Sequence, residues 1–135
     1  MPFLDTNVLL YSVSNNPADF AKRARAIAVL QREDVALSAQ VLQEFYVQAT
    51  RSSRPDPMLH GDAVDLITGW SRFPVQEINF AVVSAALQIT AKHRFSYWDS
   101  AIIAAAQALG CRELYTEDMG HGRQVEGVLI VDPFR

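Results

Sequence analysis

Four acidic positions lie far apart along the chain, each where a predicted element begins, ends or turns. Asp5 closes a short apolar run, Glu44 lies inside an amphipathic helix, Asp99 opens an Ala/Ile-rich helix, and Asp118 follows a second apolar-flanked run. Carboxylates gathered into one pocket repel one another, at roughly 3 kcal/mol per pair for a separation of about 5 Å and an effective dielectric of about 20. Such a cluster stays ionised when a hard divalent cation sits among its oxygens. The four acids therefore indicate a metal-dependent enzyme that acts on phosphates.

Each of these acids also has a simpler interpretation. Asp5 could only cap the helix after it, and Asp99 could complete a capping box that begins at Ser96. Glu44 lies on the border of an apolar stripe, where a glutamate is usually surface decoration, and Asp118 lies in a loop rich in turn formers. Because capping and metal binding use different oxygens, the two kinds of role are compatible.

Other residues near the acids could contribute to the same site. Asn7, Thr116 and Glu117 are candidates for orienting carboxylates or bound waters. His121 is a candidate for contacting a metal or a phosphate. Cys111 is the single cysteine, so it forms no intramolecular disulfide, and it is predicted to be a small core residue.

Length and composition fit one domain over residues 1–135, with half of the residues apolar and no stretch long enough to span a bilayer. The first residues lack the pattern of a signal peptide, so we expect a cytoplasmic protein. The net charge of −3 argues against a nucleic-acid binder, but two bound divalent ions would bring it to about +1. Basic residues gather at 22–25, 51–54 and 92–94, so the composition permits RNA binding.

Short apolar runs alternate with helical patterns along the chain. Strands are predicted at 3–5, 35–37, 73–78, 113–116 and 127–132. Helices are predicted at 8–11, 39–50, 58–71, 80–92 and 100–109, and a further helix begins at residues 16–19. This alternation predicts an α/β/α sandwich around a central, mainly parallel sheet. In such sheets ligands bind beyond the carboxyl ends of the strands, where Asp5 and Asp118 are both placed.

The helix that follows Asn16 has two predicted faces. One side is expected to carry Ala21, Ala24, Ile27, Ala28 and Gln31 and to face inward, while Lys22, Arg25 and Arg32 face outward.

Taken together, four short motifs resemble those of the PIN-domain family. They are Asp5-Thr6-Asn7, Glu44 after Ser-Ala-Gln-Val-Leu-Gln, Tyr97-Trp98-Asp99-Ser100 and Thr116-Glu117-Asp118-Met119. The size and motif order are similar to a VapC-type toxin, the ribonuclease half of a bacterial toxin–antitoxin pair. Motif by motif, Asp5, Glu44, Asp99 and Asp118 match the four family acids. Thr116 matches the family's Thr/Ser-x-Asp pattern, with Glu117 at its variable position.

The resemblance implies a divalent-metal-dependent endoribonuclease that binds Mg²⁺ or Mn²⁺. Asp5, Asp99 and Asp118 are then expected to hold one or two ions that activate a water for attack on an RNA phosphodiester, while Glu44 orients or deprotonates that water. It also implies a homodimer and a cognate antitoxin that inserts into the active-site groove. The helices at 39–50 and 58–71 are the expected dimer surface.

Other functional classes fit less well. A haloacid-dehalogenase-type phosphatase needs a second aspartate two residues after the first, and this chain has Asn7 there. A non-catalytic PIN-like module that binds RNA or protein is the main alternative, and loss of an acid would indicate it. A purely structural role for every acid is the third possibility.

Overall fold

Strands and helices alternate along the chain, and the computed structural model describes residues 1–135 throughout. The strands are β1 (Pro2–Leu4), β2 (Leu37–Ser38), β3 (Val75–Gln76), β4 (Glu113–Tyr115), β5 (Gln124–Val125) and β6 (Val128–Val131). The helices are α1 (Thr6–Ser12), the 3₁₀ helix η1 (Pro17–Asp19), α2 (Phe20–Gln31), α3 (Ala39–Thr50), α4 (His60–Trp70), α5 (Phe80–His93) and α6 (Tyr97–Ala108). None of these helices combines the length and apolar character needed to cross a membrane.

The strands form a mainly parallel sheet, as the sequence predicts. Four strands pair in the order β1-β4-β6-β5, and only the β5–β6 pair is antiparallel. The parallel pair β2–β3 joins the other edge of β1 through a bridge between Phe3 and Ala36. The chain therefore moves from β1 to β2 and β3 on one side and returns to β4 on the other. The strand order reverses between β1 and β4, which is where such sheets bind ligands.

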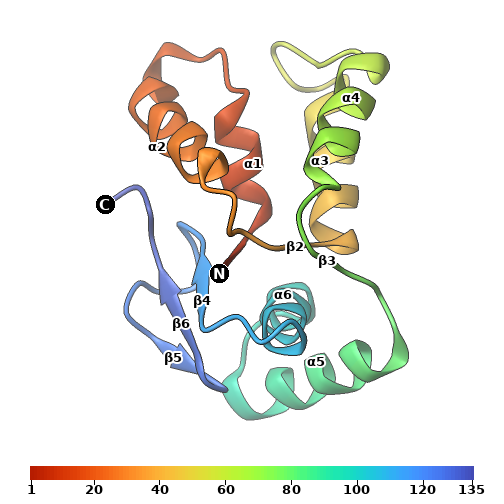
Figure 1. The fold of residues 1–135 in the computed structure, drawn as a ribbon, viewed down its shortest axis with the longest axis vertical. Coiled ribbons are helices and arrows are strands. Elements are labelled where there is room, and N and C mark those ends of the chain that lie inside the picture. Colours follow the sequence, from red (N-terminus) through yellow and green to blue (C-terminus); the bar gives the residue numbers. More distant parts are fainter.

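Helices cover both faces of the sheet. In Figure 1, α1 to α4 lie on one side of the strands, and α5 and α6 lie on the other side. Helix α6 contacts β2, β3, β4 and β6, and α5 packs against α6. This arrangement confirms the predicted α/β sandwich.

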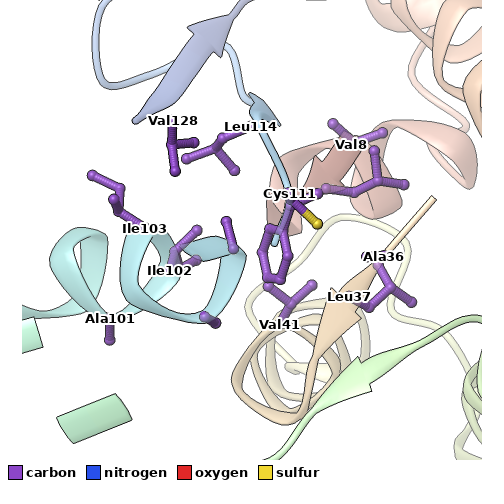
Figure 2. Close-up of a cluster of buried hydrophobic side chains, with 14 of the residues drawn as sticks. Val8, Ala36, Leu37, Val41, Ala101, Ile102, Ile103, Cys111, Leu114 and Val128 are labelled. Atoms are coloured by element: carbon purple, nitrogen blue, oxygen red, sulfur yellow. The ribbon is translucent and has the colours of Figure 1, made fainter. Parts of the chain in front are cut away.

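The core centres on α6, whose residues from Ser100 to Ala106 are all buried. Figure 2 shows Ile102 and Ile103 of this helix beside Leu114 and Val128 of the strands. Burying each of these branched side chains stabilises the fold by about 1.5–3 kcal/mol. Gly110 follows the helix with a φ of +72°, a conformation that glycine adopts without steric cost. The sequence predicted both the buried helix and its end.

Two strand predictions were inaccurate. The strand predicted at 73–78 is reduced to Val75–Gln76, since Pro74 has no N–H and contributes only its carbonyl, which accepts from Leu37 N. The sequence did not predict β5 at all. Strand β5 pairs with β6 through a tight turn in which Glu126 and Gly127 both have positive φ. Strands this short carry too little periodic signal to be recognised.

The predicted orientation of α2 was also wrong. Ala26 is its one buried residue, and Lys22 is partly buried, whereas Ala21, Ala24 and Ile27 are exposed. Alanines and long basic side chains alternate along this helix, so its apolar pattern is weak. The aliphatic stem of a lysine can cover apolar surface as well as an alanine can.

Candidate functional site

Asp5 lies where β1 ends and α1 begins, and it is only 7% exposed. Its Oδ1 accepts a 2.7 Å hydrogen bond from Thr6 N, so Asp5 caps α1 as the simpler interpretation proposed. Its Oδ2 remains free for a second partner and accepts from Thr116 Oγ1 at 2.8 Å. Asp5 N also donates to the carbonyl of Tyr115, which joins the carboxyl ends of β1 and β4. Capping therefore uses one carboxylate oxygen and leaves the other pointing toward β4.

Thr116 connects the first and last acids of the site. This fully buried residue follows β4, and its hydroxyl donates to Asp5 while accepting from Asn7 Nδ2 and from Asp118 N, each at 3.1 Å. Asn7 Nδ2 also lies 3.3 Å from Asp118 Oδ2. The structure thus brings together Asp5, Asn7, Thr116 and Asp118 at the strand switch point.

Glu44 approaches this group from α3. Its Oε1 accepts hydrogen bonds from Thr6 Oγ1 at 3.3 Å and from Gln40 Nε2 at 3.2 Å. Gln40 lies one helical turn before Glu44, and the same Nε2 also donates to the carbonyl of Trp98 at 3.2 Å. Gln40 therefore links α3 to the start of α6. Sequence reasoning missed this residue, although its i, i+4 spacing to Glu44 was visible.

Asp99 occupies the first turn of α6, as predicted. Its N–H donates to Ser96 Oγ at 3.1 Å, which confirms that Ser96 caps this helix. Apart from the side chain of Ser96, which lowers its pKa, the Asp99 carboxylate has no partner and forms no ion pair within the chain. It is consequently available to a ligand.

The four acids act electrostatically on one another. Burial, opposed by the hydrogen bonds from Thr116 and Thr6, raises the pKa of Asp5 from 3.8 to about 6, and the charges of Glu44 and Asp99 add to the increase. Burial and then the charge of Asp99 raise the pKa of Glu44, against the hydrogen bonds from Gln40 and Thr6. Burial followed by the charge of Asp118 raises the pKa of Asp99. Raised carboxyl pKa values of this origin are typical of functional sites.

The site has the charge and the donor atoms that suit a hard divalent cation. None of the four ion pairs in the chain involves Asp5, Glu44, Asp99 or Asp118, so no basic side chain neutralises them. Asn7 Oδ1 is buried and accepts no hydrogen bond, which leaves one further oxygen able to face a cation or a bound water. No three His, Cys, Asp or Glu side chains are gathered closely enough to hold a metal ion together. Coordination by Asp5, Asp99 and Asp118 stays a prediction.

Glu117 and His121 have partners outside this acidic group. Glu117 accepts from Tyr11 Oη at 2.6 Å and from Lys22 Nζ at 2.8 Å. His121 Nδ1 bonds to Asp132 N at 3.0 Å. The Tyr11–Lys22–Glu117 cluster joins three separate segments, and no local sequence pattern indicated it.

Several solved structures share this fold. A toxin–antitoxin complex from Klebsiella pneumoniae superimposes with a TM-score of 0.72 and 20% identity, covering 98% of each chain. VapC20 from Mycobacterium tuberculosis, a toxin that cleaves the sarcin–ricin loop, superimposes with a TM-score of 0.68 and 17% identity. The match covers 87% of this chain and 90% of that chain. DNA-bound VapBC from Salmonella typhimurium superimposes with a TM-score of 0.66 and 22% identity, covering 98% of this chain and 99% of that chain. At these identities the similarity shows the fold.

A comparison with curated protein sequences gives no match. The sequence profile of the PIN domain family, in contrast, matches residues 3–124, which include all four acids. This match covers most of the chain, and the protein belongs to the PIN domain family.

Proposed function

We propose that this protein is a divalent-metal-dependent endoribonuclease and the toxin of a type II toxin–antitoxin pair. The observation that carries the proposal is that Asp5, Glu44, Asp99 and Asp118 lie within electrostatic reach of one another around the ends of β1 and β4, without any basic partner. An uncompensated acidic cluster beside a buried carboxylate attracts a cation. Membership of the PIN domain family and the toxins among its structural relatives support the same function.

Each acid has a distinct part in the proposed reaction. Asp5, Asp99 and Asp118 would hold Mg²⁺ or Mn²⁺, which when bound would supply Lewis-acid activation of water and neutralise developing phosphate charge. Glu44, whose pKa is raised by burial, takes a proton from the attacking water. Thr6 and Gln40 hold the Glu44 carboxylate in place through its Oε1. Thr116 and Asn7 hold Asp5 and Asp118 at a defined separation.

The proposed partners are an RNA substrate, a cognate antitoxin and a second copy of the chain. The antitoxin is supported by relatives that were solved as toxin–antitoxin complexes. An acidic site that no basic side chain of this chain neutralises suits a basic segment of such a partner, because that segment would neutralise the carboxylates. Leu59 just before α4 and Val64 on α4 are exposed apolar residues, which supports the α4 side of the proposed dimer surface.

A non-catalytic binding module is the second candidate. It draws support from the spacing of the acids, since no three of them converge on one point. Such a module would bind RNA or protein through the same face without cleaving it.

Incubating labelled total RNA with the purified protein tests the proposal. We expect discrete cleavage products with Mg²⁺ or Mn²⁺, and none with EDTA or with the Asp5→Asn variant. Glu33→Gln is the matched control, because Glu33 is an exposed acid between α2 and β2, outside the acidic site and the proposed dimer surface. Equal activity of wild type and Asp5→Asn would contradict the nuclease assignment. RNA binding without any cleavage would support the non-catalytic module.

A further inference from the structure

The two tryptophans of this chain differ sharply in exposure. Trp70 is 6% exposed and stacks edge-on against Phe45, whereas Trp98 is 65% exposed. A large aromatic side chain is highly buried on average, so an indole left in water loses a sizeable hydrophobic stabilisation. Trp98 directly precedes Asp99, which places it at the acidic site.

Trp98 is held in a defined position. The ring of Tyr97 packs edge-on against it, with a centroid separation of 5.1 Å and an interplanar angle of 79°. The Trp98 carbonyl accepts from Gln40, the residue that also bonds to Glu44. Gln40 therefore links the main chain at Trp98 to the carboxylate proposed as the general base.

A hollow of about 330 Å³ lies between this indole and α3. Its walls include Gln43, Glu44, Gln48, Arg51 and Trp98, and only two of its seven lining residues are hydrophobic. The side chains of Gln43, Gln48 and Arg51 make no hydrogen bond or ion pair within the chain. The hollow thus offers an aromatic face, two free amides and one free guanidinium beside Glu44.

We propose that this hollow, the Trp98 subsite, binds one unpaired base of the RNA strand next to the cleavage position. The inference rests on the proposed nuclease function and names a substrate contact for it. The base stacks on the Trp98 indole, the amides of Gln43 and Gln48 meet its polar edge, and Arg51 meets a neighbouring phosphate.

The polar walls favour RNA over a second protein chain as the occupant. Glutamate is depleted at protein–protein interfaces, whereas Glu44 and three glutamines line this hollow together with Arg51. Amide and guanidinium groups can meet the polar edge of a base and a phosphate. Stacking on an indole requires a base that is free of its duplex. The Trp98 subsite therefore selects single-stranded segments or loops and excludes continuous duplex.

Binding of a labelled RNA oligonucleotide tests the subsite in the Asp5→Asn background, which keeps the probe intact. Adding Trp98→Ala should weaken binding of a mixed-sequence single strand by roughly 5- to 150-fold. Trp98→Phe keeps a stacking surface and should retain most of the affinity. The same oligonucleotide annealed to its complement should bind weakly to all variants. The matched control is Phe80→Ala, which removes a surface aromatic that is 83% exposed and lies outside the hollow.

A second readout uses the otherwise wild-type enzyme. Trp98→Ala should raise KM for an unpaired substrate and leave kcat largely unchanged, because the residue contacts the substrate away from the reacting atoms. Tryptophan fluorescence should be quenched when the single strand binds, and Trp98→Phe should abolish this quenching.

The outcomes separate the subsite from the proposed function. If the wild type cuts no RNA with Mg²⁺ or Mn²⁺, the nuclease proposal fails and the subsite fails with it. If it cuts RNA while Trp98→Ala retains the wild-type KM and affinity, the subsite alone is wrong. Analytical ultracentrifugation measures self-association of the same variants. If Trp98→Ala loses self-association but keeps its RNA affinity, the subsite proposal is wrong and Trp98 belongs to an interface between copies of the chain.

Discussion

Thr116 Oγ1 donates a 2.8 Å hydrogen bond to Asp5 Oδ2, although 111 positions separate these residues in the sequence. Both are buried, and each follows directly on a strand of the parallel pair β1–β4. The bond holds the pKa of Asp5 below the value that burial alone would impose. The contact is therefore both a structural link between two strand ends and a control on the charge of the site.

Asp5→Asn should stabilise the metal-free protein near neutral pH while abolishing its cleavage of RNA. Burial raises the pKa of Asp5 from 3.8 to about 6, so the folded state holds the proton more tightly than the unfolded state does. The stability contributed by Asp5 is fully present below pH 3.8 and is lost as the pH rises through about 6. Near neutral pH, ionised Asp5 therefore destabilises the fold by about 3 kcal/mol, and Asp5→Asn removes this destabilisation. The net gain in the variant is smaller, because the hydrogen bond that Thr116 donates to the carboxylate is lost.

Urea unfolding in EDTA at several pH values between 4 and 8 measures this effect. The difference in free energy of unfolding between Asp5→Asn and wild type should grow with rising pH through about 6. A difference that does not vary with pH would contradict the assigned pKa. Glu33→Gln, at an exposed acid between α2 and β2, is the control.

Thr116→Val should shift the acid limb of the pH–activity profile upward. The substitution keeps the shape of the side chain but removes the hydroxyl, so the pKa of Asp5 rises further and its ionised form appears only at higher pH. Stability should fall by about 1–3 kcal/mol, because Asp118 N and Asn7 Nδ2 lose their acceptor. Thr116→Ser should restore both properties. An unshifted profile in Thr116→Val would show that this hydroxyl does not control Asp5.

Mn²⁺ should stabilise the wild type against unfolding. At a concentration of 100 times Kd, binding to the folded state alone adds about 2.7 kcal/mol to the free energy of unfolding. Thermal unfolding with and without Mn²⁺ measures this readily without any RNA present. Asp99→Asn should lose most of the stabilisation, and equal stabilisation of both proteins would place the metal elsewhere.

Glu44→Gln should slow cleavage by roughly 100- to 10,000-fold, the usual effect of removing a general base. The amide oxygen can still accept from Thr6 and Gln40, so the fold and the helix packing should be unaffected. Single-turnover kinetics over a range of Mg²⁺ concentrations should show a lower maximum rate with an unchanged metal dependence. A shifted metal dependence would instead make Glu44 a metal ligand.

Glu117→Gln should have a small effect, with activity retained to within about tenfold and stability changed by less than about 1 kcal/mol. Its partner Lys22 is 42% exposed, and ion pairs at such positions contribute little. Cleavage assays and urea unfolding test both values. A loss as large as that of Asp5→Asn would place Glu117 in the reaction itself.

The sequence by itself determined the helix caps, the buried helix α6 and the family. Ser38, Asn16 and Ser96 accept hydrogen bonds from N–H groups two or three residues ahead, so each cap could be predicted from neighbouring residues alone. The burial of α6 followed from its run of alanines and isoleucines. Four short acidic motifs were enough to indicate the PIN domain family, which the family profile confirms.

Only the tertiary structure decided which of these groups meet. The parallel pairing of β1 with β4 brings Thr116 within hydrogen-bond distance of Asp5. The packing of α3 does the same for Glu44 and Thr6, because strand pairing and helix packing join segments far apart in the chain. The pairing of Glu117 with Lys22, and the inward face of α2, depend on the same long-range contacts. Local hydrogen bonds and side-chain periodicity are properties of neighbouring residues, whereas the burial and mutual repulsion of the acids exist only once the whole sheet has formed.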